Sequence, residues 1–387
     1  MKKEFSLLGI FSFIFLILNS SEGNFAQTKK NESSSVPLVM YDFLGGLMSL
    51  QPYMVSSQKF SDPRNSEKIE KYLFDLSSQT KRLSHSQRLN TATFQVSAEL
   101  LQSHLAKVQD LFIQGRKEYA RKMLNATMDG CSSCHAQVPA ENNSMWKFRA
   151  NEIKGNDFEK AEFLFALRHY DEALQYYDKA ISNYHPKHDE FSYLETALKR
   201  KLAIYIRAKQ SPKLAVESFK NDLHNKKWKA ALKSEVSGWV SALNKITPQK
   251  NPSVSAKDLG NFASNVIPPL LTAQAQFKPG SYVLFLYVSG LIYQFINTHK
   301  QAELTPELFY WLAVCDIHLS QSYFFSLADL YLKECIKRFP SSPVAEKCYA
   351  ELESTTLDSY TGSSGIHMPE EVKKELKTYK SMLKQTL

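Results

Sequence analysis

Apolar residues recur every three or four positions along most of this 387-residue chain, and this spacing favours α-helices over strands. Between residues 37 and 138 it predicts four amphipathic helices with short connections, which form an antiparallel bundle by default. The expected core positions are Met40, Leu44, Leu47 and Leu50 or Gln51 in the first helix, Ile69, Leu73, Leu76, Thr80 and Leu83 in the second, Leu101, Leu105 or His104, Val108 and Phe112 in the third, and Ala120, Leu124, Thr127, Cys131 and Cys134 in the fourth.

Proline, glycine and capping residues predict where these helices begin and end. Pro37 lies near the start of the first helix and Pro52 is expected to close it. The pair Asn65-Ser66 caps the second helix. Gly115 is expected to end the third, and Pro139 follows the fourth.

The fourth helix carries the sequence Cys131-Ser132-Ser133-Cys134-His135, which has the C-x-x-C-H spacing of a c-type haem attachment site. Two cysteines three residues apart lie on one face of a helical turn, so both thiols can form thioethers with the vinyl groups of one porphyrin. The adjacent histidine can then bind the iron from the proximal side. We therefore expect one covalent haem c, attached to Cys131 and Cys134, with His135 as an iron ligand.

The same two cysteines also fit a redox dithiol or half of a zinc site. A dithiol of the thioredoxin type follows a strand, and no strand pattern precedes Cys131. A zinc site needs a second pair of ligands at short spacing, which Cys315, Cys335 and Cys348 do not provide. Cys335 and Cys348 flank a turn, and the sequence leaves open whether they form a disulfide or remain free thiols.

The N-terminus favours haem among these alternatives because it has the pattern of an export signal. Charged residues 2–4 precede an apolar run from Leu7 to Leu18, and small or polar residues follow. Cleavage after Gly23 or Ala26 fits this pattern. We therefore expect a signal peptide over 1–26, a linker over 27–36, and a periplasmic or otherwise exported protein. The alternative is an uncleaved membrane anchor, for which the run is short.

Residues 37–140 resemble the class II c-type cytochromes, the cytochrome c-prime and c-556 group, because C-x-x-C-H lies near the end of a fourth helix. The resemblance implies a four-helix bundle. In the c-556 branch a methionine of the first helix is the sixth iron ligand, and Met40 has the corresponding place, with Met48 and then His104 as weaker candidates. In the c-prime branch that side of the iron is open. Packing of Met40 in the core is equally consistent with the sequence.

This chain departs from the family after the haem histidine. Class II members often have a basic residue on the following turn, where this chain has Ala136-Gln137-Val138-Pro139. Arg116 or Arg121 is a candidate substitute for contacts to the haem propionates.

The region 146–387 keeps helical spacing and predicts an α-solenoid-like repeat domain. Residues 157–186 resemble a tetratricopeptide hairpin, with small residues at Ala173 and Ala180 and Tyr177 between the helices. Further units are expected near 202–219 and 311–340, but their spacing exceeds the ~34-residue period of the standard repeat. A proline-rich stretch, 247–280, is expected to interrupt the array. Repeat domains present concave surfaces that suit a protein partner.

Charge and apolar runs constrain the partners. The net charge is +9, and the basic stretches 199–201 and 226–229 have the pattern of solvated helix faces. Such faces suit an acidic partner or an anionic membrane surface, and no nucleic-acid motif accompanies them. The apolar run 281–296 is short for a membrane span and predicts a buried core helix, so no transmembrane span is expected after signal cleavage.

Together these features predict an all-α, exported monohaem c-type cytochrome that transfers single electrons, with the helical repeats docking a redox partner protein. Two alternatives remain: a haem sensor or scavenger of diatomic gases, and a repeat scaffold whose haem is structural. No G-x-S-x-G, H-E-x-x-H or phosphate-loop motif is present, although an open haem iron would still permit enzyme activity.

The export signal predicts a defined mature N-terminus. Intact-mass measurement of the exported protein should find a chain that begins after Gly23 or Ala26. Phe13→Asp should block export because it interrupts the apolar run, whereas Ser34→Asp in the linker should leave export unchanged. A mature protein that retains residues 1–23 would contradict this prediction.

Overall fold

The computed structural model describes residues 36–84, 92–135, 152–246, 255–272, 274–275, 278–299, 304–319, 323, 326–363 and 365–384. The predicted signal peptide and nearly all of the predicted linker lie outside them. The chain divides into two compact units, Met1–Thr127 and Met128–Leu387, which are described separately. Because this division falls inside helix α6 (Lys117–His135), the predicted haem-domain boundary at residue 140 stays a prediction.

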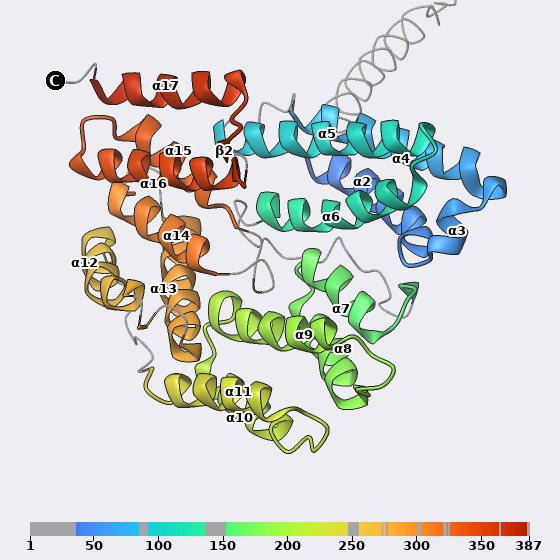
Figure 1. The fold of residues 1–387 in the computed structure, drawn as a ribbon, viewed down its shortest axis with the longest axis horizontal. Helices are drawn as coiled ribbons and strands as arrows, with labels where there is room; N and C mark the ends of the chain where they lie inside the picture. Colours follow the sequence, from blue (N-terminus) through green and yellow to red (C-terminus); the bar gives the residue numbers. More distant parts are fainter. Residues whose placement is uncertain are drawn as a thin grey trace, which may run out of the picture. The chain divides into compact units, whose positions relative to one another are not determined.

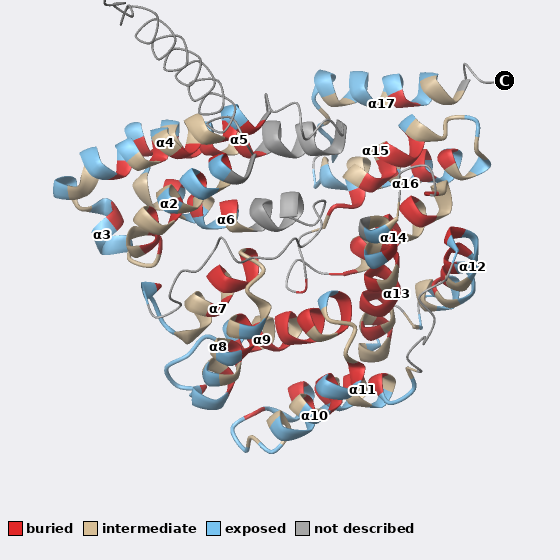
Figure 2. Cartoon of the chain, turned by 180° about the vertical axis from the view of Figure 1, so that it is seen from behind, coloured by how far each residue is buried: buried red, intermediate tan, exposed pale blue. Residues whose placement is uncertain are grey.

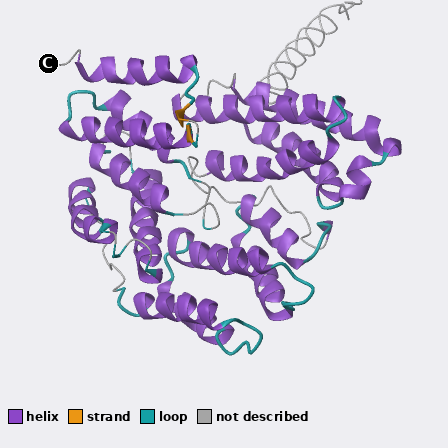
Figure 3. Cartoon of the chain, viewed as in Figure 1, coloured by secondary structure: helices purple, strands orange, loops and turns teal. Residues whose placement is uncertain are grey.

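The predicted all-α class is confirmed for the described residues, in which helices are almost the whole of the regular structure (Figure 3). The strands found in this part of the chain are β1 (Thr361–Gly362) and β2 (Gly365–Ile366). They form a short antiparallel hairpin in which Thr361 pairs with Ile366.

The first unit contains long helices at the predicted places (Figure 1). Its described elements are α2 (Val36–Met54), α3 (Ser57–Ser61), the 3-10 turn η1 (Pro63–Asn65), α4 (Ser66–Ser84), α5 (Ala92–Ile113) and α6. All five predicted core residues of α4 are buried, and so are Leu101, Leu105, Val108 and Phe112 of α5. The apolar spacing therefore identified the buried faces of both helices.

The prediction for α2 was partly wrong. Leu47, Leu50 and Gln51 are buried as predicted, but Met40 and Leu44 are only half-buried, and Val39, Phe43 and Met54 are buried instead. Apolar residues occupy both stripes, so spacing alone did not select one. The helix also continues past Pro52 to Met54. Proline removes one backbone donor, which is a small loss so close to the end of a helix.

Gly115 ends α5 as predicted, through a Schellman motif. Its φ of 78° is in the left-handed region that glycine adopts without strain. The Gly115 amide donates to the carbonyl of Phe112, and the Arg116 amide donates to that of Leu111. This turn reverses the chain and allows α6 to begin at Lys117.

The second unit is a succession of helices that pack against their neighbours in sequence (Figure 1). Its elements are α7 (Asp157–Ala166), α8 (Tyr170–Asn183), α9 (Phe191–Ala203), the π-helical turn η5 (Ile204–Ala208), α10 (Pro212–Asp222), α11 (Ala230–Leu243), α12 (Ala256–Val266), the 3-10 turn η6 (Pro268–Leu271), α13 (Pro279–Thr298), α14 (Pro306–His318), α15 (Ala328–Arg338), α16 (Pro343–Ser359) and α17 (Glu370–Lys384).

Helices α7 and α8 form the predicted hairpin over 157–186. Ala173 and Tyr177 are fully buried, as the spacing indicated. The proline-rich stretch 247–280 is less irregular than predicted, because it contains α12. A capping box, in which Ser255 and Asp258 exchange hydrogen bonds with each other's backbone, fixes the start of this helix.

Helix α13 is the predicted core helix. Within the described part of the chain, it is the one helix long and apolar enough to cross a membrane, over Pro279–Ile296. However, 56% of that window is buried inside the protein, and Val283, Phe285 and Leu286 are inaccessible to solvent (Figure 2). Its apolar surface is therefore largely covered by protein, which favours the core-helix interpretation.

The basic stretch 199–201 is not a solvated face, contrary to prediction. Arg200 is 5% exposed and Lys201 is fully buried. Arg200 binds both carboxylate oxygens of Glu162 in α7, at 3.2 and 3.3 Å. Lys201 lies 2.5 Å from Asp178 of α8 and 2.7 Å from Asp222 of α10. The stretch 226–229 is solvent-exposed as predicted, since its three lysines are exposed around the buried Trp228, but it lies in the loop between α10 and α11 and not on a helix face.

A third buried cation follows in η5. Arg207 is 5% exposed and donates to Asp316 Oδ1 of α14 at 2.7 Å. The other carboxylate oxygen of Asp316 accepts from the backbone amide of Leu327 at 3.0 Å. Burial lowers the pKa of Arg207, but the charge of Asp316 outweighs this effect, so the net shift is upward. The guanidinium therefore stays charged and needs its partner.

A disulfide joins Cys335 of α15 to Cys348 of α16, across the turn that precedes α16. This resolves the alternatives that the sequence left open. The remaining described cysteine, Cys315, is a buried free thiol in α14.

The Arg207–Asp316 pair predicts a large stability effect. Asp316→Asn should lower the free energy of unfolding by about 3–5 kcal/mol, because it removes the carboxylate charge that pairs with a buried guanidinium. The control Glu370→Gln makes the same chemical change in an exposed pair, in which Lys373 and Glu370 are 47% and 83% exposed, and should cost about 0–1 kcal/mol. Urea denaturation of the two variants checks this, and equal losses would contradict it.

Candidate haem-attachment site

The backbone of α6 is helical through His135, so Cys131, Cys134 and His135 lie in its last two turns. Earlier on this helix, Ala120, Leu124 and Thr127 are at most 1% exposed. Positions 131 and 134 continue that spacing and so share the helix face that is buried over 120–127. The side chains of 129–135 lie outside the described residues.

Arg121 fastens α6 to the end of α2. Its Nη1 donates to the carbonyl of Met54 at 2.7 Å, and Asn125 Nδ2 lies 3.4 Å from the same oxygen. Met54 is the last residue of α2, and its carbonyl has no partner within that helix. Side chains from α6 therefore satisfy the end of α2 and fix how the two helices meet.

Glu118 holds Arg121 in place. The guanidinium donates to both carboxylate oxygens of Glu118, at 2.7 and 3.0 Å, and Ser57 of α3 donates to one of them at 2.7 Å. Hydrogen bonds from Arg121 and then Ser57 lower the pKa of Glu118 from 4.5 to about 2. The carboxylate is therefore charged over the whole physiological range, and the first turn of α6 is tied to α3 as well as to α2.

The methionines of α2 differ in burial. Met40 and Met48, the first and second candidates for the sixth ligand, are both half-buried, whereas Met54 is 4% exposed and packs in the core. Neither candidate occupies the buried stripe.

His104 has a structural partner. Its Nε2 lies 2.7 Å from the backbone carbonyl of Met123 in α6. Because a carbonyl oxygen can only accept, this nitrogen carries the proton and donates. In this arrangement Nε2 links α5 to α6 and has no free lone pair for iron.

The proposed substitutes for haem propionate contacts are not well placed. Arg121 is engaged with Glu118 and Met54, and it lies ten residues before Cys131, about 15 Å along the helix axis. Arg116 is exposed at the α5–α6 turn, where its guanidinium lies 5.1 Å from the ring centre of Tyr119. Both arginines belong to the opposite end of α6 from the motif.

The remaining cysteines are committed elsewhere. Cys335 and Cys348 form the disulfide, and Cys315 is fully buried among apolar residues of α14. Burial raises the pKa of the Cys315 thiol far above its usual range. None of the three is therefore available as a thiolate ligand beside Cys131 and Cys134.

Sequence reasoning missed Arg121 as the residue that positions α6. The available signal was the i, i+3 spacing of Glu118 and Arg121, which indicates an ion pair on one helix face. Nothing in the local sequence identified Met54, 67 residues away, as the acceptor.

Comparison of the chain with protein-family models, with curated proteins and with solved structures gave no match.

The contacts of Arg121 predict a measurable change at Glu118. Arg121→Ala should raise the pKa of Glu118 from about 2 toward 4.5, because the largest cause of the lowered value is removed. A lowered carboxyl pKa stabilises the fold above pH 4.5, and this stabilisation is lost as the pH falls toward 2. In the variant this stabilisation should be smaller, and its loss should be complete at a higher pH, because the folded pKa lies closer to 4.5. NMR titration of the Glu118 carboxyl carbon measures the shift.

Lys122→Ala is the matched control. It also removes a cation from α6, but Lys122 is exposed and acts on Glu118 only through weak Coulomb attraction. Its effect on the pKa should be much smaller than that of Arg121→Ala. Equal shifts in the two variants would show that the hydrogen bonds are not the cause.

Proposed function

We propose that this protein is an exported monohaem c-type cytochrome that carries single electrons. The observation that supports this most directly is the position of C-x-x-C-H in the last two turns of a long helix. A helical backbone through His135 presents positions 131 and 134 on one side, which is what attachment to one porphyrin needs.

The chemistry of the other cysteines supports haem over zinc. A structural zinc site takes four ligands, commonly four cysteines or a mixture of cysteine and histidine. A disulfide holds two of the three other cysteines, and the third is buried. The disulfide also suits an oxidising compartment, which is where the predicted export signal would direct the chain.

The residues that would hold the haem have distinct roles. Cys131 and Cys134 would fix the porphyrin through thioethers, so that it cannot dissociate. His135 would bind the iron and set the proximal side. When bound, haem c supplies an iron that gains and loses one electron. Met40, half-buried on α2, is our candidate for the distal ligand, and a histidine–methionine pair raises the reduction potential.

The second unit would dock the redox partner. Many of its helices pack against their neighbours in sequence, which supports a helical-repeat interpretation, and helical-repeat domains bind partners on extended surfaces. The exposed lysines 226, 227 and 229 give one of its loops a positive charge. An acidic partner surface would complement this loop and speed the encounter.

Haem staining of the denatured protein tests covalent attachment. The wild-type chain should stain, and Cys131→Ala together with Cys134→Ala should abolish the stain, because both thioethers are lost. Cys315→Ala is the control, since it removes the buried free cysteine of α14, outside the C-x-x-C-H motif, and should leave the stain unchanged. A wild-type chain that never stains would exclude this function.

The absorption spectrum tests electron transfer against gas binding. A methionine-ligated iron gives low-spin bands and resists carbon monoxide, and Met40→Ala should convert it to a high-spin form that binds carbon monoxide. Met48→Ala, at a similarly half-buried position of the same helix, should not. High-spin bands in the wild type would favour the gas-binding alternative. An unchanged Met40→Ala spectrum would exclude Met40 as ligand.

A further inference from the structure

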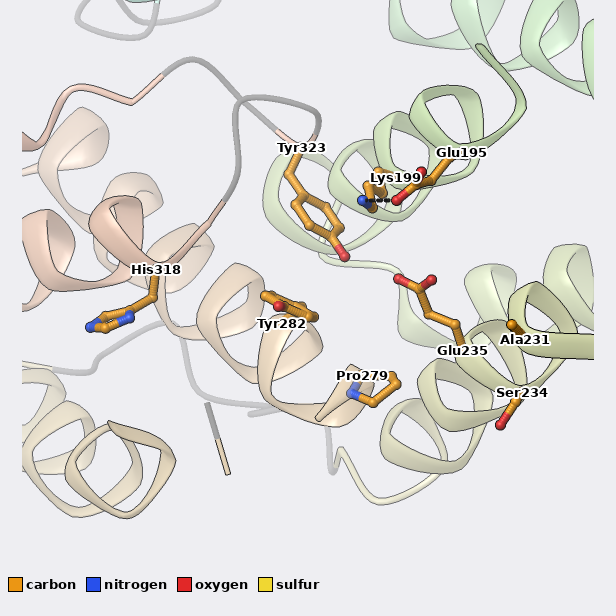
Figure 4. A pocket seen from close by; sticks show the side chains of 9 residues that line it. All are labelled: Glu195, Lys199, Ala231, Ser234, Glu235, Pro279, Tyr282, His318 and Tyr323. Atoms are coloured by element: carbon orange, nitrogen blue, oxygen red, sulfur yellow. Dashed lines mark hydrogen bonds and ion pairs between the residues drawn. The ribbon is translucent and has the colours of Figure 1, made fainter. Parts of the chain in front are cut away.

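The second unit contains a pocket of about 580 Å³ that the haem chemistry does not use (Figure 4). Its volume is in the range of sites for small organic molecules. Helices α9, α11, α13 and α14 contribute to its wall, together with the isolated residue Tyr323. The lining residues are Glu195, Lys199, Ala231, Ser234, Glu235, Pro279, Tyr282, His318 and Tyr323.

Tyr323 is buried but has a free hydroxyl. The residue is 1% exposed, and its Oη has no hydrogen-bond partner. Figure 4 shows this hydroxyl pointing between Tyr282 and Glu235. Its backbone is fixed by Arg200, which donates to the Tyr323 carbonyl at 3.1 Å. A buried hydroxyl without a hydrogen-bond partner is unfavourable, and a ligand that binds the hydroxyl would remove this cost.

Glu235 supplies an uncompensated negative charge. The carboxylate is half-buried on α11 and makes no ion pair or hydrogen bond with another residue of the described part of the chain. Glu195, the other carboxylate in the wall, is already paired with Lys199. The wall contains two carboxyl groups, Glu195 and Glu235, and one ammonium group, Lys199. Burial raises the pKa of Glu235, and the attraction of Lys199 does not cancel the effect, so a bound cation would stabilise the Glu235 carboxylate.

Two aromatic rings stand beside this charge. The rings of Tyr282 and Tyr323 stack with centres 5.5 Å apart and planes 26° apart. Lys199 Nζ already lies 5.7 Å from the ring centre of Tyr323, so this ring attracts cations in the protein itself. His318 does not repel a cation at pH 7, because burial lowers the pKa of its imidazole and keeps the ring neutral.

We propose that this pocket binds a small molecule or side chain with a primary ammonium group. The ammonium would donate to the Glu235 carboxylate and to Tyr323 Oη, with its alkyl part against the Tyr282 ring. A quaternary ammonium has no N–H and would leave Tyr323 without a partner. An anion would meet the unpaired carboxylate. The size of the pocket leaves room for several carbon atoms beyond the ammonium.

Calorimetric titration of the full chain at pH 7 with n-butylamine tests the proposal. We expect saturable binding that Glu235→Gln weakens at least about tenfold, since the counter-charge is lost, a change of about 1.4 kcal/mol. Tyr323→Phe should weaken it severalfold. Glu217→Gln is the matched control, because Glu217 is an exposed residue of α10 outside the pocket. This variant should bind n-butylamine with the affinity of the wild type.

Three further probes complete the test. Tetramethylammonium should bind more weakly than n-butylamine, and equal affinity would overturn the assignment to primary ammonium. Tighter binding of N-acetyl-lysine methylamide than of n-butylamine would assign the site to a lysine of a partner protein, and the reverse order would assign it to a free amine.

Acetate should not bind. Absence of saturable amine binding, or equal binding by Glu235→Gln with an unchanged circular dichroism spectrum, would overturn the proposal.

Discussion

Three buried cations on one continuous helical segment organise the second unit. Arg200, Lys201 and Arg207 lie on α9 and η5, and each is at most 5% exposed. An unpaired charge cannot be buried at this depth without a large loss of free energy. Their acidic partners come from α7, α8, α10 and α14, so these helices must all take their places for the charges to be neutralised. These ion pairs therefore fix the relative positions of the helices whose apolar faces form the core of the unit.

This arrangement also shapes the pocket. Arg200 reaches past its partner Glu162 and binds the backbone of Tyr323. The preceding residue, Lys199, pairs with Glu195 in the pocket wall. Of these two adjacent residues of α9, Arg200 therefore forms a buried ion pair and Lys199 lines the pocket. The interior ion pairs supply the rigidity that a binding site needs.

Sequence spacing predicted most helices and many buried residues, because amphipathic periodicity is a local property. It found every core position of α4 but was only partly right for α2, where Met40 and Leu44 were expected in the core and Val39 and Phe43 are buried instead. It also failed at Arg200 and Lys201. The sequence shows that these residues are charged, but their acidic partners are up to 38 residues away, and only the fold brings them together. The pocket depends on residues from 195 to 323 and has no local motif.

The disulfide between α15 and α16 affects which of the five cysteines can pair with one another as the chain folds. Its two cysteines are 13 residues apart, whereas pairing either with Cys131 would close a loop of roughly 200 residues. Loop-closure entropy favours the short loop by about 2 kcal/mol. The second unit can therefore form its covalent link without capturing the cysteines of α6.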